Sequence, residues 1–176
     1  MLCVIGVLDE AAEEKLEKLR RPASAVYDVN TPLHGHVTFA TYIGEDEIRF
    51  VQECRKLLEG VSSFTVEYRK IEVFENTTNI AAIPERNDNL ISLHRKITAA
   101  FSSGLDQWTA TDCWNPHTTL VTGPDHDPHS LCRQMAEAFV PFSAVISKIE
   151  FSRVLDDGYD IIDHIDLAGK GYQKKS

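Results

Sequence analysis

One short pattern occurs twice in this chain, and it constrains the possible folds more than any other feature. His36-Val37-Thr38-Phe39 and His117-Thr118-Thr119-Leu120 both have a histidine, a threonine two residues later and then an apolar residue, about eighty residues apart. The β-branched and aromatic residues in each motif favour a strand. Alternate residues of a strand share a face, so each motif presents an imidazole and a hydroxyl side by side. We therefore expect two similar strands within one fold.

The pattern of apolar residues and turn residues predicts the remaining elements. Strands are expected over residues 2–8, 36–43, 63–74, 79–84, 117–122, 143–155 and 159–167, and helices over residues 9–21, 46–58, 87–101 and 128–139. Pro22 is predicted to end the first helix, and Gly60 is predicted to cap the second. Because the order is mixed rather than strictly alternating, we predict an α+β fold with mainly antiparallel sheet.

Length and composition fit one globular domain over residues 1–176. Apolar residues make up 43% and charged residues 26% of the chain, which are average values for such proteins. No apolar run approaches the roughly 20 residues of a membrane helix, and Met1 leads into a predicted strand without a basic leader. The net charge of -9 opposes tight binding of long nucleic acid, but a small nucleotide or cyclic phosphate can still bind.

The cysteines argue for a reducing compartment. Cys3, Cys54, Cys113 and Cys132 lie far apart and form no Cys-x-x-Cys pair. This spacing disfavours a structural zinc site and requires no disulfide. We expect reduced thiols in a cytoplasmic, monomeric protein that does not associate with membranes.

The two histidines could divide the work of acid and base between them. An unperturbed imidazole has a pKa of about 6.5, so it exists in both protonation states near neutral pH. Cleaving a phosphodiester needs a base for the attacking oxygen and an acid for the leaving oxygen. Thr38 and Thr119 could donate hydrogen bonds to the phosphoryl oxygens. We therefore predict His36 and His117 as catalytic residues and the two threonines as substrate-binding residues, without a metal or other cofactor.

These motifs resemble those of the 2H phosphoesterase superfamily, which includes RNA 2',3'-cyclic phosphodiesterases, also called 2'-5' RNA ligases. The stretch Trp114-Asn115-Pro116-His117-Thr118-Thr119-Leu120 is especially similar to the second motif of that family, in which proline often precedes the histidine. The resemblance implies a duplicated, bilobal α+β body of two pseudo-symmetric lobes, with antiparallel sheets flanked by helices and the active cleft between the lobes.

The same resemblance implies an activity. It implies a hydrolase for 2',3'-cyclic or 2'-5' phosphodiester bonds of nucleotides or short RNA ends, with a role in RNA processing and ligation as the reverse reaction. In the family, the second-motif histidine is usually assigned to the water and the first to the leaving oxygen. This implies that His117 acts as base and His36 as acid. Tyr42, Trp114 and Tyr159 are candidates to stack on a base or to cap the cleft.

Other interpretations of the histidines stay open. His34 precedes His36 by two residues and shares its face, which permits a metal-dependent hydrolase. His126 and His129 lie at a predicted helix entrance, where surface positions are expected, and structural roles are expected for His94 and His164. The chain could also be a module that binds a nucleotide or phosphate in the same cleft without turnover.

Overall fold

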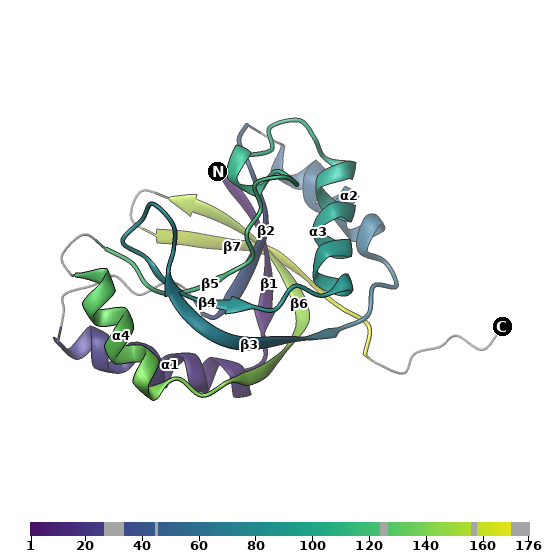
Figure 1. The fold of residues 1–176 in the computed structure, drawn as a ribbon. Helices are drawn as coiled ribbons and strands as arrows, with labels where there is room; N and C mark the ends of the chain where they lie inside the picture. The colour runs from purple at the N-terminus through teal and green to yellow at the C-terminus, as the bar shows by residue number, and fades with distance from the viewer. Residues whose placement is uncertain (27–33, 45, 124–126, 156–157, 170–176) are drawn as a thin grey trace.

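The computed structural model describes residues 1–26, 34–44, 46–123, 127–155 and 158–169. Within them the chain forms seven strands and four helices (Figure 1). The strands are β1 (Leu2–Leu8), β2 (His36–Tyr42), β3 (Phe64–Val73), β4 (Ile80–Pro84), β5 (Thr118–Val121), β6 (Phe142–Leu155) and β7 (Gly158–Asp166). The helices are α1 (Glu10–Val26), α2 (Glu47–Leu58), α3 (Asp88–Ala100) and α4 (Pro128–Ala138), and a short 3-10 turn spans Gln107–Thr109.

All seven strands belong to one sheet, and every ladder between them is antiparallel. The main path runs β2-β1-β6-β3-β4-β5, and β7 pairs with β6 beside it. Residues 142–146 of β6 pair with β3, and residues 148–155 pair with β7 on the same edge. The predicted α+β class and antiparallel sheet are therefore confirmed.

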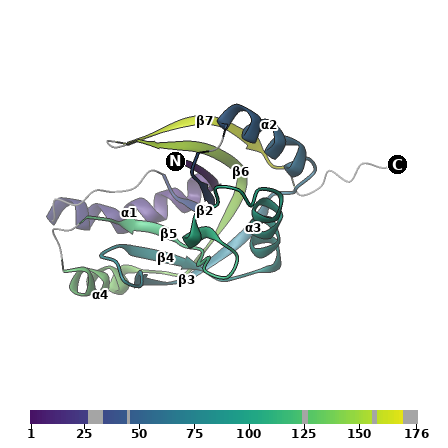
Figure 2. The same ribbon diagram turned by 90° about the horizontal axis from the view of Figure 1, so that it is seen from above.

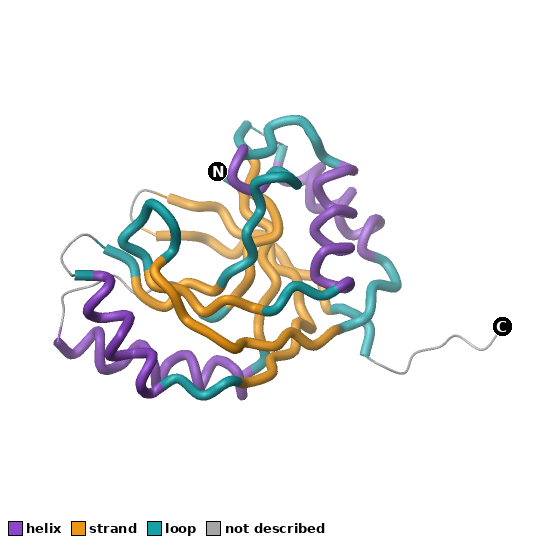
Figure 3. The backbone as a smooth tube through the Cα atoms, in the orientation of Figure 1, coloured by secondary structure: helices purple, strands orange, loops and turns teal. Residues whose placement is uncertain are grey.

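The helices gather in two pairs at different ends of the sheet. Helices α1 and α4 contact each other, and so do α2 and α3. Two perpendicular views show one pair on each side, with the strands between them (Figure 1, Figure 2), and the tube coloured by secondary structure shows the same arrangement (Figure 3). No helix within the described residues is both long and apolar enough to cross a membrane.

The helices begin close to the predicted positions, and only the end at Pro22 differs clearly. Asp46 and Asn87 cap α2 and α3 by accepting hydrogen bonds from backbone N–H groups. Gly60 follows α2 with a φ of 75°, the left-handed conformation that glycine favours. Helix α1 was predicted to end at Pro22, but it continues to Val26. Since Ala23 is buried in the core just after that proline, packing outweighs the backbone hydrogen bond that proline cannot make.

A close approach between β1 and β2 requires glycine at position 6. Gly6 pairs with Val37, and a Cβ atom there would lie 2.5 Å from Phe39 Cε2 and 3.1 Å from Ile146 Cγ2. Both neighbours are fully buried, so they cannot move aside without disturbing the core.

Gly6→Ala should therefore destabilise the protein by about 1–3 kcal/mol through overpacking, measured by denaturant unfolding. Gly158→Ala is the matched control, because nothing lies within 4 Å of a Cβ atom there. Equal stability of the two variants would contradict the packing that we describe.

Candidate active site

The two motif strands lie side by side although they occupy opposite ends of the sheet path. The Thr118 hydroxyl, in β5, donates to the His36 carbonyl, in β2, over 2.9 Å. Trp114 Nε1 donates to the Thr38 carbonyl, also over 2.9 Å. The sheet is therefore curved enough for its two terminal strands to meet, and both histidine motifs come to one place.

A buried tyrosine supports this junction. Tyr68, on β3, is fully buried, and its hydroxyl lies 2.6 Å from Thr118 Oγ1. Because the single hydroxyl proton of Thr118 goes to His36, the tyrosine is the donor in this bond. Burial raises the pKa of Tyr68, which keeps its donor proton in place. The chain of hydrogen bonds thus runs from β3 through β5 to β2.

Both catalytic candidates are oriented in the same way. His36 Nδ1 lies 2.8 Å from the carbonyl oxygen of His34, and His117 Nδ1 lies 2.9 Å from that of Asn115. A carbonyl can only accept, so each ring carries its proton on Nδ1 when neutral, and Nε2 keeps its lone pair. No hydrogen bond from a described residue reaches either Nε2. Each imidazole therefore offers one nitrogen to a substrate.

The alternation expected for the two strands is present. His36, Thr38, His117 and Thr119 are all partly exposed, whereas the intervening Val37, Phe39, Thr118 and Leu120 are buried. In both strands the histidine and the threonine two residues after it therefore share the accessible side. The structure brings together the four residues that the sequence singled out.

Burial sets the resting charge of the two rings. Burial lowers the pKa of His36 to about 4, although the hydrogen bond to the His34 carbonyl acts in the opposite direction. The neighbouring charges of His34, His117 and Arg20 lower it further. Burial also lowers the pKa of His117 from its ordinary value, again opposed by a backbone carbonyl. Both rings are therefore mainly neutral at pH 7 without a ligand.

Two of the three aromatic candidates lie in the core. Tyr42 is fully buried, and its ring centroid lies 4.7 Å from that of Phe50. Trp114 is 7% exposed and stacks on His94 at 3.9 Å. His94 Nε2 is in turn 2.9 Å from the Thr109 carbonyl, which fits the structural role expected for this histidine. Neither Tyr42 nor Trp114 presents an open ring to a ligand.

The third aromatic candidate lies far along the sheet. Tyr159 is exposed on β7 and pairs with Val154 of β6. His36 pairs with Val7, which pairs with Lys148, six residues earlier on β6. At about 3.3 Å per residue, the two positions are roughly 20 Å apart along that strand. Tyr159 therefore does not stand beside the histidines in this structure.

A different aromatic residue contacts the site. The ring centroid of Phe74 lies 4.1 Å from that of His117. Phe74 immediately follows β3, and its N–H bonds to Asn79 across the hairpin to β4. The hairpin thus contributes a ring to the second motif, although Asn79 lies next to Ile80, which pairs with Val121 at the other end of β5. No local pattern in the sequence points to this contact, because Phe74 and His117 are far apart in the chain.

Of the remaining histidines, His34 lies beside His36. His34 Nε2 lies 3.0 Å from Glu150 Oε2, at ion-pair distance, and its ring centroid is 6.2 Å from that of His36. His129 and His164 are exposed, and His126 lies outside the described residues. Among the residues with described positions, no group of three or more His, Cys, Asp or Glu side chains could hold a metal ion.

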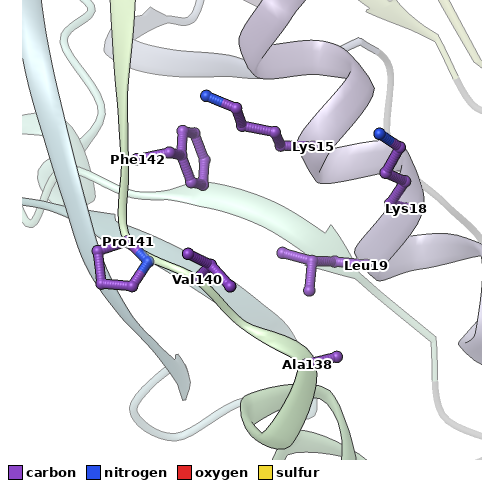
Figure 4. Close-up of a pocket in the computed structure, with 7 residues that line it drawn as sticks. All are labelled: Lys15, Lys18, Leu19, Ala138, Val140, Pro141 and Phe142. Atoms are coloured by element: carbon purple, nitrogen blue, oxygen red, sulfur yellow. The ribbon is translucent and has the colours of Figure 1, made fainter.

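A separate groove of about 500 Å³ lies between α1 and the segment that joins α4 to β6 (Figure 4). It is lined by Lys15, Lys18, Leu19, Ala138, Val140, Pro141 and Phe142. None of these residues belongs to either histidine motif, so the groove and the histidines are distinct features.

The low pKa of His36 has a measurable effect on stability. The unfolded chain takes up a proton at this ring near pH 6.5, whereas the folded protein resists protonation until about pH 4. The free energy of unfolding should therefore be intact above pH 6.5 and fall as the pH drops from 6.5 to 4, by at most about 3 kcal/mol for this one group.

His36→Asn should remove this part of the pH dependence, as measured by urea unfolding at several pH values. Asparagine keeps an N–H group that can reach the His34 carbonyl but does not titrate. His129→Asn, which removes an exposed imidazole from α4, is the control. An unchanged slope between pH 4 and 6.5 in the His36 variant would show that the ring is not buried in its neutral form.

Residues 7–158 match the sequence model of the 2'-5' RNA ligase superfamily. No curated protein matches the chain. Among solved structures, Escherichia coli LigT without ligand has 16% sequence identity and a TM-score of 0.59, over 95% of this chain and 96% of that one.

Two further solved structures show the same fold. Escherichia coli LigT in complex with 3'-AMP has 15% identity and a TM-score of 0.60, over 94% of this chain and 96% of that chain. A protein described as a phosphoesterase has 15% identity and a TM-score of 0.59, over 95% and 97%. Because the family match includes both histidine motifs and most of the chain, this protein belongs to the 2'-5' RNA ligase superfamily of two-histidine phosphoesterases, whose members act on phosphodiester bonds.

Proposed function

We propose that this protein hydrolyses 2',3'-cyclic or 2'-5' phosphodiester bonds of nucleotides or short RNA ends, without a metal. The observation that carries the proposal is the matched orientation of two imidazoles. Each Nδ1 is held by the carbonyl two residues earlier, and the Thr118 hydrogen bond joins the strands that bear the two rings. An acid and a base that act on one phosphodiester need two such imidazoles, each with a nitrogen that the backbone does not occupy.

The proposed reaction consists of two proton transfers and one displacement. His117 Nε2 takes a proton from water, and the water oxygen forms a new bond to phosphorus. The bond from phosphorus to the ribose oxygen then breaks, and protonated His36 gives its Nε2 proton to that oxygen. The assignment of base to His117 and acid to His36 follows the usual assignment in the family. At a 2'-5' bond, reversal of these steps would join two ends with release of water, and the roles of the histidines would exchange.

The electrostatics of the site agree with binding of an anion before turnover. Burial disfavours the protonated form of both imidazoles. The negative charge of a bound phosphodiester favours the protonated form, so substrate binding raises the pKa of a neighbouring histidine. An acid that is mainly neutral in the free protein can thus be charged in the complex. Because the pKa of His36 lies so low in the free protein, His36 needs a large compensation from the bound anion to act as the acid.

The two threonines complete the proposed site. Thr38 and Thr119 share the accessible faces of their strands with the histidines. Their hydroxyl groups can donate to the non-bridging oxygens, where negative charge accumulates in the transition state. The net charge of -9 favours substrates with few phosphates, because a longer strand would be repelled by the protein as a whole.

The direct test is turnover of the four nucleoside 2',3'-cyclic monophosphates by EDTA-treated protein. We expect ring opening in the wild type and a decrease of about 10²- to 10⁴-fold in kcat for His36→Ala and for His117→Ala. His164→Ala, which removes an exposed imidazole on β7, is the control. Binding without product in the wild type would indicate a non-catalytic module, and loss of turnover with EDTA would indicate a metal enzyme.

Removing the hydroxyl groups gives an independent test. Thr38→Val and Thr119→Val should each lower kcat more than they raise KM, by about 10-fold or more, because the proposed hydrogen bonds strengthen in the transition state. Thr38→Ser and Thr119→Ser keep the hydroxyl group and should retain most of the activity. If the serine and valine variants lose equal activity, the hydroxyl groups do not bind the phosphate.

A further inference from the structure

The two histidines differ in the hydrogen bonds of the peptide group that orients each ring, and a carboxylate of α1 causes the difference. Glu13 accepts a hydrogen bond from the backbone N–H of Gly35 and another from Arg20 Nη1, the second over 2.7 Å. Arg20 is 3% exposed, and its Nη2 lies 3.4 Å from the Thr119 carbonyl. The two members of one ion pair on α1 therefore contact both motif strands: Glu13 bonds to Gly35, and Arg20 bonds to Thr119.

The bond from Glu13 ends on the peptide that orients His36. The N–H of Gly35 and the C=O of His34 belong to the same peptide group, and that C=O accepts the hydrogen bond from His36 Nδ1. A carboxylate, a peptide and an imidazole are thus connected in series. Hydrogen bonds in series polarise one another, so a negative charge at the N–H end makes the carbonyl a better acceptor for His36.

The backbone at this point is held on both sides. The Gly35 carbonyl accepts from the N–H of Leu8 on β1, over 3.0 Å. A Cβ atom at position 35 would lie 2.4 Å from Leu16 Cδ1 and 2.6 Å from the Glu13 carboxylate. Only glycine allows the helix to approach so closely, and the peptide that bears the His34 carbonyl is fixed as a result.

The second histidine cannot have the same support. His117 Nδ1 is oriented by the carbonyl of Asn115. The nitrogen of that peptide group belongs to Pro116 and carries no hydrogen. No carboxylate can accept a hydrogen bond from it. Both catalytic candidates therefore bond to a backbone carbonyl, but only the peptide behind His36 is itself bonded to a carboxylate.

We propose that Glu13 is a positioning residue for His36, acting through the peptide between His34 and Gly35, and that Arg20 ties this support to the Thr119 strand. The inference rests on the proposed function for its effect on turnover. Its effect on the state of His36 does not depend on turnover, so the two can be tested separately.

The charges of the pair predict opposite effects on His36. Glu13→Gln leaves the positive charge of Arg20 uncompensated near the ring, so the pKa of His36 should fall further. Arg20→Met removes that positive charge and should raise the pKa of His36. His117, which has no such connection, should change less in both variants. A loss of packing alone would not shift the pKa of His36 in opposite directions.

The experiment is a titration of the histidines by NMR, with ¹⁵N shifts to report which ring nitrogen carries the proton. Glu14→Gln and Arg21→Met, at exposed neighbouring positions of α1, are the matched controls and should leave His36 unchanged. Shifts of equal sign in the Glu13 and Arg20 variants, or no shift in either, would overturn the proposal. If Arg20→Met does not fold, Arg20→Lys keeps the charge and should leave the pKa close to that of the wild type, unlike Glu13→Gln.

Kinetics give the second measurement. Outer partners of functional histidines are typically worth about 10- to 100-fold, so Glu13→Gln should lower kcat by about tenfold or more with little change in KM. Wild-type kcat in Glu13→Gln, together with an unchanged tautomer of His36, would contradict the positioning role. Absence of turnover in the wild type would instead remove the proposed function and leave the titration result standing.

Discussion

The hydrogen bond from the Thr118 hydroxyl to the His36 carbonyl is the contact on which the rest of the site depends. It joins the two terminal strands of the sheet path, β2 and β5. The donor is buried and receives a hydrogen bond from the buried hydroxyl of Tyr68. An unpaired polar group at this depth would cost about 1–3 kcal/mol, so the three groups favour one register between the strands. That register puts one imidazole and one threonine from each motif on the accessible side.

The site resolves a conflict between burial and charge. An acid-base pair must bind a proton, yet burial lowers the pKa of both rings. The backbone carbonyls at Nδ1 act against this and also direct Nε2 outward. A site of this kind rests in its neutral form and gains a proton only when an anion compensates for it. Under the proposed function, the same electrostatics favour phosphate esters over neutral ligands.

Local patterns predicted most of the elements, because periodicity and turn residues act over a few neighbours. The alternation in each motif placed His36 with Thr38 and His117 with Thr119 on shared faces, as the burial pattern shows. Nearness in sequence does not predict which aromatic rings face the site, because Tyr42 and Trp114, although close to the motifs, are buried in the core. Contacts made across the sheet, such as Phe74 on His117 and Glu13 on the Gly35 N–H, depend on strand order and leave no local signal.

The long strand β6 limits how this protein can move. It pairs with β1 along one edge and with β3 and then β7 along the other. It therefore connects the strands on the β2 side of the sheet to those on the β5 side. A hinge that spread β2 and β5 apart would have to bend this strand or break its ladders, each of which contains several cooperative hydrogen bonds. Opening by rigid rotation of two halves is therefore costly. The spacing between the two histidine strands is therefore set by the sheet itself.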